Sequence, residues 1–322
     1  MNQPLDQSHL DTLRRVFGDR MLEQEPLAPY TSLRVGGPAD ALIKAGSADE
    51  LALGARTAWA AGIPFRVIGG GCNLLVSDNG YRGLIILNRA RQVTLMVDGD
   101  RPRLRAESGA TLAVAARKAI KAGWGGLEWA ATVPGSVGGA VINNAGAFGG
   151  NMQGDLLMAE ILQQGRPVEA WTSEDMAYAY RKSALKRNPG SVVLAAELEL
   201  RPSTPQACKE KVQSFMAKRK RSQPPGASMG STFMNPPGDF AGRLLEEAGL
   251  KGESVGPVQV STLHANFVVN SGGGRAQEVL ALIRRMRSMV LERSGVTLDL
   301  EIELFGDWEQ GALEGLEEKV GS

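Results

Sequence analysis

The sequence predicts an α+β protein of more than one domain, with a mixed α/β first half. A chain of 322 residues is long enough for two or three domains that each have a core. Strand and helix patterns alternate up to Gly123, which is the order typical of α/β structure. A proline-containing stretch at residues 201–205 then marks a boundary, beyond which a second, smaller part of the chain begins.

The first half opens with a short polar helix and linker over residues 1–25. Ser47 and Glu50 form a capping box, which predicts a helix that ends at Gly62. Thr111 is expected to cap an alanine-rich helix that ends at Gly123. Apolar and β-branched runs predict strands at residues 32–35, 41–44, 63–68, 84–88, 92–97 and 103–107.

The remaining elements follow from the same signals. Residues 159–163 and 167–171 flank a turn sequence and predict a hairpin. A short helix is expected from Ser173 into residues 178–183. Further helices are predicted from Pro205 to Arg221, from Phe240 to Ala248 with Asp239 as cap, and from Arg275 to Arg293. Strands are predicted at 192–200, 258–259, 265–270 and 296–305, followed by an acidic tail expected to fray.

Composition excludes several classes of protein. Hydrophobic content of 43% and charged content of 22% are ordinary for a globular protein, and the net charge of +1 argues against a nucleic-acid or membrane-surface partner. Two cysteines and two histidines leave no basis for a disulfide framework or a metal cluster. Neither a signal peptide nor a membrane-length apolar run is visible, so we expect a cytoplasmic protein. The basic residues 218–221 are better explained as cations that complement a helix C-terminus.

Two glycine-rich runs point to a phosphate-containing ligand. Residues 126–150 read GLEWAATVPGSVGGAVINNAGAFGG, and the strand that ends at Ile68 runs directly into GGGCNLLV. Glycine lets backbone N–H groups approach a phosphate and permits left-handed turns. The alternative, a tight turn with close packing, fits an isolated glycine pair better than it fits this density. Neither G-x-G-x-x-G nor the P-loop pattern occurs, so any dinucleotide is expected in a different fold.

Three motifs in order carry a resemblance to a known family. They are TSLRVGGPA at residues 31–39, GGGCNLLV at 69–76 and VPGSVGGAVINNAGAFGG at 133–150. Over residues 27–306 the chain resembles the UDP-N-acetylenolpyruvoylglucosamine reductase (MurB) family, within the flavoproteins typified by vanillyl-alcohol oxidase. The resemblance implies a vanillyl-alcohol-oxidase/PCMH-type fold of two α/β subdomains plus a smaller α+β substrate-binding domain. The implied boundaries are 1–88, completed by 298–322, then 89–202 and 203–297.

The resemblance also implies the ligands. The cofactor would be non-covalent FAD, with NADPH as hydride donor and a UDP-sugar, the enolpyruvyl ether of UDP-N-acetylglucosamine, as substrate of a cytoplasmic monomer. The positions that match the family's FAD contacts are Arg34, Gly69, Gly70, Gly71, Cys72, Asn73, Leu74, Pro134, Gly135, Ser136, Gly138, Gly139, Asn144, Ala145 and Gly146.

Three positions match the family's catalytic residues. Ser231 falls on the proton donor of the Gly-Ser-x-Phe-x-Asn-Pro pattern, and Arg181 on the carboxylate-binding arginine of Tyr-Arg-x-Ser. Glu301 falls on the glutamate of the closing strand, although Leu300 and Glu303 replace that motif's usual proline and arginine. Alone, each fits an ordinary role: a loop hydroxyl, a surface ion pair and a solvated acidic strand face.

The same patterns nominate substrate contacts at Tyr180, Asn235, Gln223 and His264, with a structural hydrogen bond equally expected for His264. No tyrosine lies between Arg181 and Ser231, which indicates the family type that lacks the tyrosine-bearing loop. Two alternatives remain open: another flavin-dependent oxidoreductase of the same fold group, or a sugar-nucleotide-binding regulator without turnover. A nucleic-acid binder is the weakest alternative.

Overall fold

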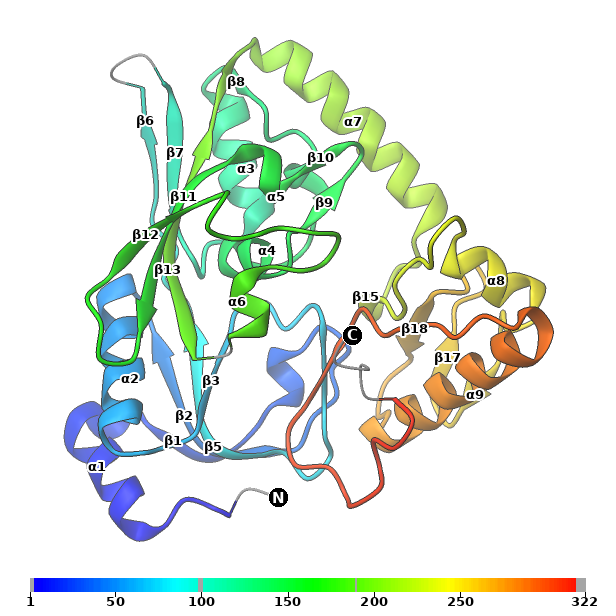
Figure 1. Cartoon of the computed structure of the whole chain (residues 1–322), viewed down its shortest axis with the longest axis horizontal. Helices are drawn as coiled ribbons and strands as arrows, with labels where there is room; N and C mark the ends of the chain where they lie inside the picture. The colour runs from blue at the N-terminus through cyan, green and yellow to red at the C-terminus, as the bar shows by residue number, and fades with distance from the viewer. Residues whose placement is uncertain (1–2, 98–100, 189, 317–322) are drawn as a thin grey trace.

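The computed structural model describes residues 3–97, 101–188 and 190–316 (Figure 1). Two sheets with their helices lie side by side, and a long helix, α7 (Pro205–Ser222), leads from them to a third group of elements. In the described part of the chain, no helix is long and apolar enough to cross a membrane.

The first sheet has four strands in the order β1-β2-β5-β3. Its inner strands pair in parallel, and β1 is an antiparallel edge. The predicted cap holds, because Ser47 Oγ accepts from the backbone N–H of Glu50 at 3.2 Å. The elements are α1 (Gln7–Phe17), η1 (Gly18–Arg20), β1 (Leu22–Pro26), η2 (Ala28–Tyr30), β2 (Pro38–Ala45), α2 (Ala48–Ala60), β3 (Phe65–Ile68), β4 (Leu74–Val76) and β5 (Tyr81–Asn88).

The second sheet has five antiparallel strands in the order β12-β11-β13-β7-β6. One face packs against α3 and α4, and Val192 and Leu194 on the other face share a core with α2. Its strands are β6 (Val93–Met96), β7 (Arg103–Glu107), β11 (Leu156–Gln163), β12 (Glu169–Thr172) and β13 (Ser191–Glu199). Around it lie α3 (Leu112–Lys121), β8 (Trp124–Gly125), η3 (Ala130–Thr132), α4 (Val137–Ile142), β9 (Gly146–Ala147), β10 (Gly150–Asn151), α5 (Met152–Asp155), α6 (Ala184–Arg187) and β14 (Arg201–Pro202).

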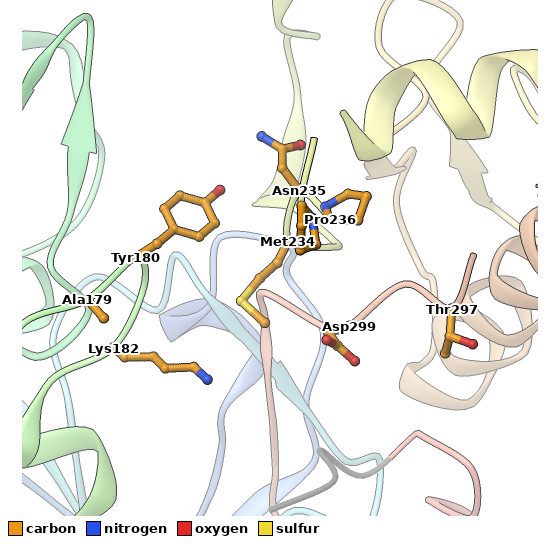
Figure 2. A pocket seen from close by; sticks show the side chains of 9 residues that line it. Ala179, Tyr180, Lys182, Met234, Asn235, Pro236, Thr297 and Asp299 are labelled. Atoms are coloured by element: carbon orange, nitrogen blue, oxygen red, sulfur yellow. The ribbon is translucent and has the colours of Figure 1, made fainter. Parts of the chain in front are cut away.

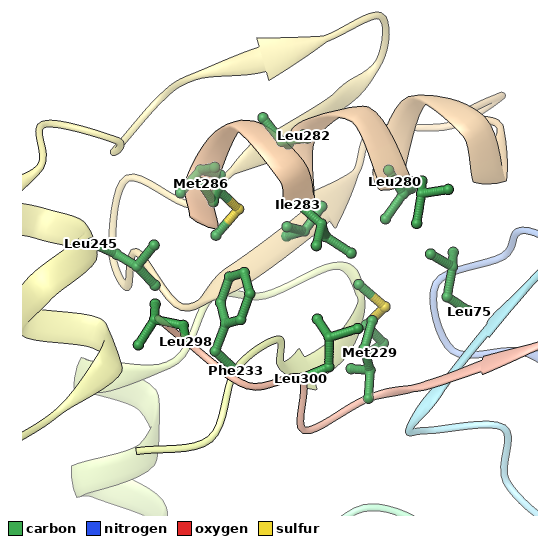
Figure 3. Packing of buried hydrophobic residues seen from close by; sticks show 14 of the residues in the cluster. Leu75, Met229, Phe233, Leu245, Leu280, Leu282, Ile283, Met286, Leu298 and Leu300 are labelled. Atoms are coloured by element: carbon green, nitrogen blue, oxygen red, sulfur yellow. The ribbon is translucent and has the colours of Figure 1, made fainter. Parts of the chain in front are cut away.

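The third group packs two helices on a four-stranded sheet, β15-β18-β17-β16. Figure 3 shows its core, where Ile283 and Met286 lie over Phe233. Leu75 belongs to the same cluster, so this core extends to the first part of the chain. The elements are β15 (Ala227–Ser231), α8 (Ala241–Glu247), β16 (Ser254–Val255), β17 (Val258–Val260), β18 (Phe267–Asn270) and α9 (Ala276–Ser294).

The end of the chain returns to the first part, because β19 (Glu303–Phe305) pairs in parallel with β4. Between Gly306 and Leu316 the chain is packed rather than frayed, since Trp308 and Leu316 are buried in the third core. The remainder of the predicted frayed tail, residues 317–322, lies outside the described part. The predicted domain boundaries at residues 88, 202 and 297 stay predictions.

Two predicted elements are turns instead. Residues 32–35 do not form a strand, because Thr31 Oγ1 hydrogen-bonds both the N–H and the carbonyl of Val35, and Arg34 has a left-handed φ of 58°. Residues 173–183 do not form a helix, because Ala177 and Arg181 have φ values of 43° and 58°.

Two further predictions were wrong in detail. Of the final strand predicted over 296–305, only Glu303–Phe305 is a strand. Asp239 is not the cap residue of α8: Phe240 occupies that position, and Asn235 Oδ1 accepts from the N–H of Ala241 at 3.1 Å. Asp239 instead accepts from the N–H of Phe240 and pairs with Arg243.

Candidate active site

The two glycine-rich runs meet in space. A Cβ on Gly69 would lie 2.3 Å from Ser136 Oγ, and one on Gly70 would lie 3.2 Å from the Cα of Gly135. Loops in such contact have no room for side chains between them. The glycines that predicted a phosphate-binding surface therefore belong to one surface rather than to two separate turns.

A third segment, residues 30–34, contacts the same glycine-rich loop at Gly71. Ser32 donates from both its backbone N–H (3.0 Å) and its hydroxyl (3.1 Å) to the carbonyl of Gly71. Gly71 has a left-handed φ of 60°, and a Cβ there would lie 2.2 Å from the carbonyl oxygen of Tyr30. Arg34 follows in the same turn and is exposed. We call residues 30–34, 69–74 and 134–139 together the glycine cradle.

The cradle presents backbone donors. Within the described part of the chain, the N–H groups of residues 70–73 donate to no protein acceptor. Consecutive unpaired amides around a left-handed residue form an anion-binding nest. Cys72 adds no negative charge, because burial raises the pKa of its thiol. These features fit the diphosphate of FAD.

The last three residues of the predicted FAD set, Asn144, Ala145 and Gly146, lie after α4, and their contact with FAD stays a prediction. Asn144 is buried, its Oδ1 accepts from the N–H of Gln153 (3.0 Å), and its Nδ2 donates to the carbonyl of Ala179 (3.1 Å). Ala145 and Gly146 lead into the β9–β10 hairpin. The structure gives Asn144 a bracing role towards the turn described next.

Arg181 lies in a two-residue turn. Ala179 and Lys182 close it with two backbone hydrogen bonds, each 3.1 Å long. The guanidinium of Arg181 lies 5.6 Å from the ring centroid of Tyr180, and its Nε lies 2.8 Å from Glu301 Oε1. Thus the structure brings together two of the predicted catalytic side chains, from positions 181 and 301.

The backbone N–H and the backbone carbonyl of Glu301 are both hydrogen-bonded. Its N–H donates to the carbonyl of Thr232 (2.9 Å), and its carbonyl accepts from Asn73 Nδ2 (3.0 Å). Burial raises the pKa of Glu301 above its ordinary value, while the charges of Arg181 and Lys186 oppose the rise. The solvated strand face considered as an alternative for Glu301 is excluded, because its side chain is only 14% exposed.

Ser231 ends β15 one residue before this contact with Thr232. It pairs with Phe267 of β18, so a sheet edge fixes its backbone. The predicted trio therefore comes from three separate parts of the chain. Arg181 and Glu301 form an ion pair, and Ser231 adjoins the residue that anchors Glu301.

A pocket of about 350 Å³ adjoins this group. Figure 2 shows Tyr180 and Lys182 on one side of it and Met234, Asn235 and Pro236 facing them. Its full lining is Ala179, Tyr180, Lys182, Met234, Asn235, Pro236, Pro237, Thr297 and Asp299. Two of the predicted substrate contacts, at positions 180 and 235, thus line the pocket.

The other two predicted substrate contacts do not line it. Gln223 ends α7, where its N–H donates to the carbonyl of Arg219. His264 packs over Gly242, and its Nδ1 accepts from the N–H of Asn266 at 3.2 Å. Burial lowers the pKa of His264, which favours the neutral ring that this bond requires. These contacts support the structural alternative for His264.

Sequence reasoning missed two lysines. Lys182 lines the pocket, and the Nζ of Lys186 donates to the carbonyl of Arg181 at 3.5 Å. The available signal was their position, within and just after the Tyr-Arg-x-Ser pattern, which places cations next to a group expected to bind a carboxylate.

The fold and the cradle define a flavoprotein with an FAD-binding domain, and a family model of that description matches residues 39–164. A model of the C-terminal domain of UDP-N-acetylenolpyruvoylglucosamine reductase matches residues 222–305. The chain belongs to the UDP-N-acetylenolpyruvoylglucosamine reductase family. It is 44% identical to the enzyme of that name from Rubrobacter xylanophilus, over 93% of this chain and 99% of the relative.

Other relatives agree with this assignment. The reductase of Chloroflexus aggregans is 42% identical over 87% of this chain and 96% of its own length. The crystal structure of the reductase (MurB) from Thermus caldophilus superposes with a TM-score of 0.75 at 36% identity, covering 88% of this chain and 98% of that one.

Proposed function

We propose that the protein reduces the enolpyruvyl ether of UDP-N-acetylglucosamine to UDP-N-acetylmuramate, a step of peptidoglycan precursor synthesis, with FAD as cofactor and NADPH as reductant. The observation that carries the proposal is the Arg181–Glu301 ion pair, with Nε and Oε1 2.8 Å apart. It lies next to the strand end that bears Ser231, and residues beside Arg181 line the pocket.

The cofactor would be held by the glycine cradle, with its diphosphate at the amides of residues 70–73. Bound FAD supplies hydride transfer, from NADPH to the methylene carbon of the enolpyruvyl group. The protein supplies the position of the substrate, the neutralisation of its charge and the proton.

Arg181 binds the substrate carboxylate. A guanidinium offers two parallel charge-assisted hydrogen bonds, which strengthen as electron density moves onto the carboxylate. The ring of Tyr180 lies near the guanidinium of Arg181. The turn closed by Ala179 and Lys182 restricts the backbone conformation of Arg181. Lys186 adds a second positive charge near Glu301.

Glu301 acts as a protonated donor to the same carboxylate. Its ion pair with Arg181 describes the protein before substrate enters. When a second carboxylate shares the guanidinium, like-charge repulsion raises the pKa of Glu301 beyond the rise that burial already causes. Substrate binding therefore favours the neutral acid, which can donate its single O–H to the substrate carboxylate.

Ser231 delivers the proton to the second carbon of the enolpyruvyl group. A serine hydroxyl is a weak acid, so it donates only to the strongly basic carbon that follows addition at the methylene. Asn235 and Tyr180 line the pocket, where we place the nucleotide-sugar portion of the substrate. We further propose that the protein works as a monomer in the cytoplasm.

The test is anaerobic absorbance of the purified protein loaded with FAD. NADPH should bleach the flavin spectrum, and UDP-N-acetylglucosamine enolpyruvate should restore it. Bleaching without recovery would retain the flavoprotein but contradict the substrate. Failure to take up FAD would contradict the cofactor assignment as well.

A further inference from the structure

Two side-chain hydroxyls fasten the turn that carries Arg181 to the C-terminal end of α4. The phenol of Tyr178 donates to the carbonyl of Val141 at 2.8 Å, and Ser183 Oγ donates to the carbonyl of Ile142 at 2.6 Å. These carbonyls lie in the last turn of a helix, where carbonyls lack intrahelical partners. The hydroxyls therefore satisfy the helix end and fix both flanks of the turn.

A third side chain fastens the turn from the loop after α4. Asn144 Nδ2 donates to the carbonyl of Ala179, the residue that opens the two-residue turn. Its Oδ1 is held in place by the N–H of Gln153. The carboxamide is thus oriented from one side and braces the turn from the other.

The turn depends on such anchors because its backbone is strained. Ala177 and Arg181 have left-handed φ values of 43° and 58°, which residues other than glycine seldom adopt unless the surroundings enforce them. Without the anchors, the turn would relax towards more ordinary backbone angles, and the guanidinium would move with it.

The helix whose carbonyls accept these hydrogen bonds, α4, starts at the glycine cradle. Ser136 caps α4 and lies against Gly69, while the far end of the six-residue helix holds the turn. At 1.5 Å per residue, α4 is a rigid spacer of about 9 Å between the cofactor loops and the arginine.

We propose that Tyr178, Ser183 and Asn144 are positioning residues, which use α4 to fix the guanidinium of Arg181 relative to the glycine cradle. The proposal rests on the proposed function, in which Arg181 binds the substrate carboxylate. None of the three is assigned to touch the reacting atoms. A displacement of about 1 Å can slow a chemical step by roughly a hundredfold. Residues that hold the guanidinium in place therefore affect the rate without touching the substrate.

The first test is Tyr178→Phe, with Tyr81→Phe as matched control because Tyr81 is a buried tyrosine outside the site. In Tyr178→Phe we expect reoxidation of the reduced flavin by substrate to slow about threefold to tenfold, the cost of one hydrogen bond. Flavin reduction by NADPH should stay within about twofold of wild type. The control should change neither rate. Equal loss in both half-reactions of Tyr178→Phe would overturn the proposal.

A second test asks whether the effect passes through the guanidinium. In an Arg181→Ala background, Tyr178→Phe should cause no further loss, since no guanidinium remains to be positioned. A full additional loss there would overturn the proposal.

Ser183→Ala should behave like Tyr178→Phe. Ser294→Ala is its control, because Ser294 Oγ also donates to a helix-end carbonyl, that of Val290 at the end of α9.

A third readout does not depend on the substrate. Hydrogen–deuterium exchange of a peptide that spans residues 177–183 should accelerate in Tyr178→Phe and not in Tyr81→Phe, because the bonded amides of Ala179 and Lys182 lose their frame. Unchanged exchange would sink the inference even if the proposed substrate were wrong. A wild-type protein inactive on that substrate, but with accelerated exchange in the variant, would reject the proposed function alone.

Discussion

The side-chain amide of Asn73 donates a hydrogen bond to the backbone carbonyl of Glu301, 3.0 Å away and 228 positions later in the sequence. The backbone carbonyl of Asn73 in turn accepts from the N–H of Glu303 at 2.8 Å. One residue of the glycine cradle thus clasps the segment that bears the buried carboxylate. The glycine cradle and the segment that bears Glu301 are therefore joined directly by hydrogen bonds.

This clasp predicts the effect of Asn73→Asp. The substitution replaces a donor by a carboxylate that faces a carbonyl, so we expect the free energy of unfolding to fall by about 1–3 kcal/mol. Reoxidation of the flavin by substrate should slow as well. Urea unfolding of the FAD-free protein measures the first effect, and Asn79→Asp, at an exposed turn position, is the control. Equal stability of the two variants would show that the clasp contributes nothing.

Ser231→Ala should separate the two half-reactions. Flavin reduction by NADPH should stay near wild type, and reoxidation by substrate should slow by about 10²–10⁴-fold, the usual contribution of a positioned proton donor. Stopped-flow absorbance follows both steps. Ser228→Ala, on the same strand, should leave both rates close to wild type. If Ser231→Ala slowed both steps alike, the proton-donor role would be wrong.

The raised pKa of Glu301 makes a prediction about pH. A carboxyl whose folded pKa is raised binds its proton more tightly in the folded state, so folding stability is lost as pH rises from the ordinary value of 4.5 through the folded value. The stability of the wild type relative to Glu301→Gln should therefore fall with rising pH across that window. Chemical denaturation at a series of pH values checks this. An opposite slope would mean that Arg181 and Lys186 outweigh burial.

Gly71→Ala tests the cradle. The left-handed φ of 60° costs an alanine about 1–2 kcal/mol, and the overlap with the Tyr30 carbonyl adds a further loss of about 1–3 kcal/mol. Gly62→Ala isolates the first cost, since Gly62 has a φ of 66° and nothing within 4 Å of the added Cβ. Only Gly71→Ala should also weaken FAD binding, measured by fluorescence titration. Equal FAD affinity in both variants would argue against the cradle as the cofactor site.

How far the sequence predicts this protein depends on how local the deciding interaction is. The Ser47–Glu50 cap and the strand that ends at Ile68 follow from neighbours in sequence and were confirmed. The density of glycine predicted a phosphate surface, because bare backbone has few other uses. That residues 69–70 pack on residues 135–136 could not be derived, since only the folded chain brings them together.

The site residues show the same limit. Arg181, Ser231 and Glu301 were predicted through motif resemblance, and their catalytic roles stay predictions. The helix expected around Tyr178 was wrong, because hydrogen bonds to α4 hold a left-handed turn that propensity does not favour. Lys182 and Lys186 were missed because no motif specifies a lysine at either position.

The return of β19 to β4 sets an order for the folding of the chain. Contacts such as Phe305–Val76 and Asn73–Glu301 join distant positions, so their loop-closure entropy opposes early formation. We expect the sheets to form first and the cofactor surface last, when the returning segment docks. In refolding experiments, the change in FAD fluorescence that accompanies binding should then lag behind the recovery of the circular dichroism signal. FAD binding would therefore report the last step of folding.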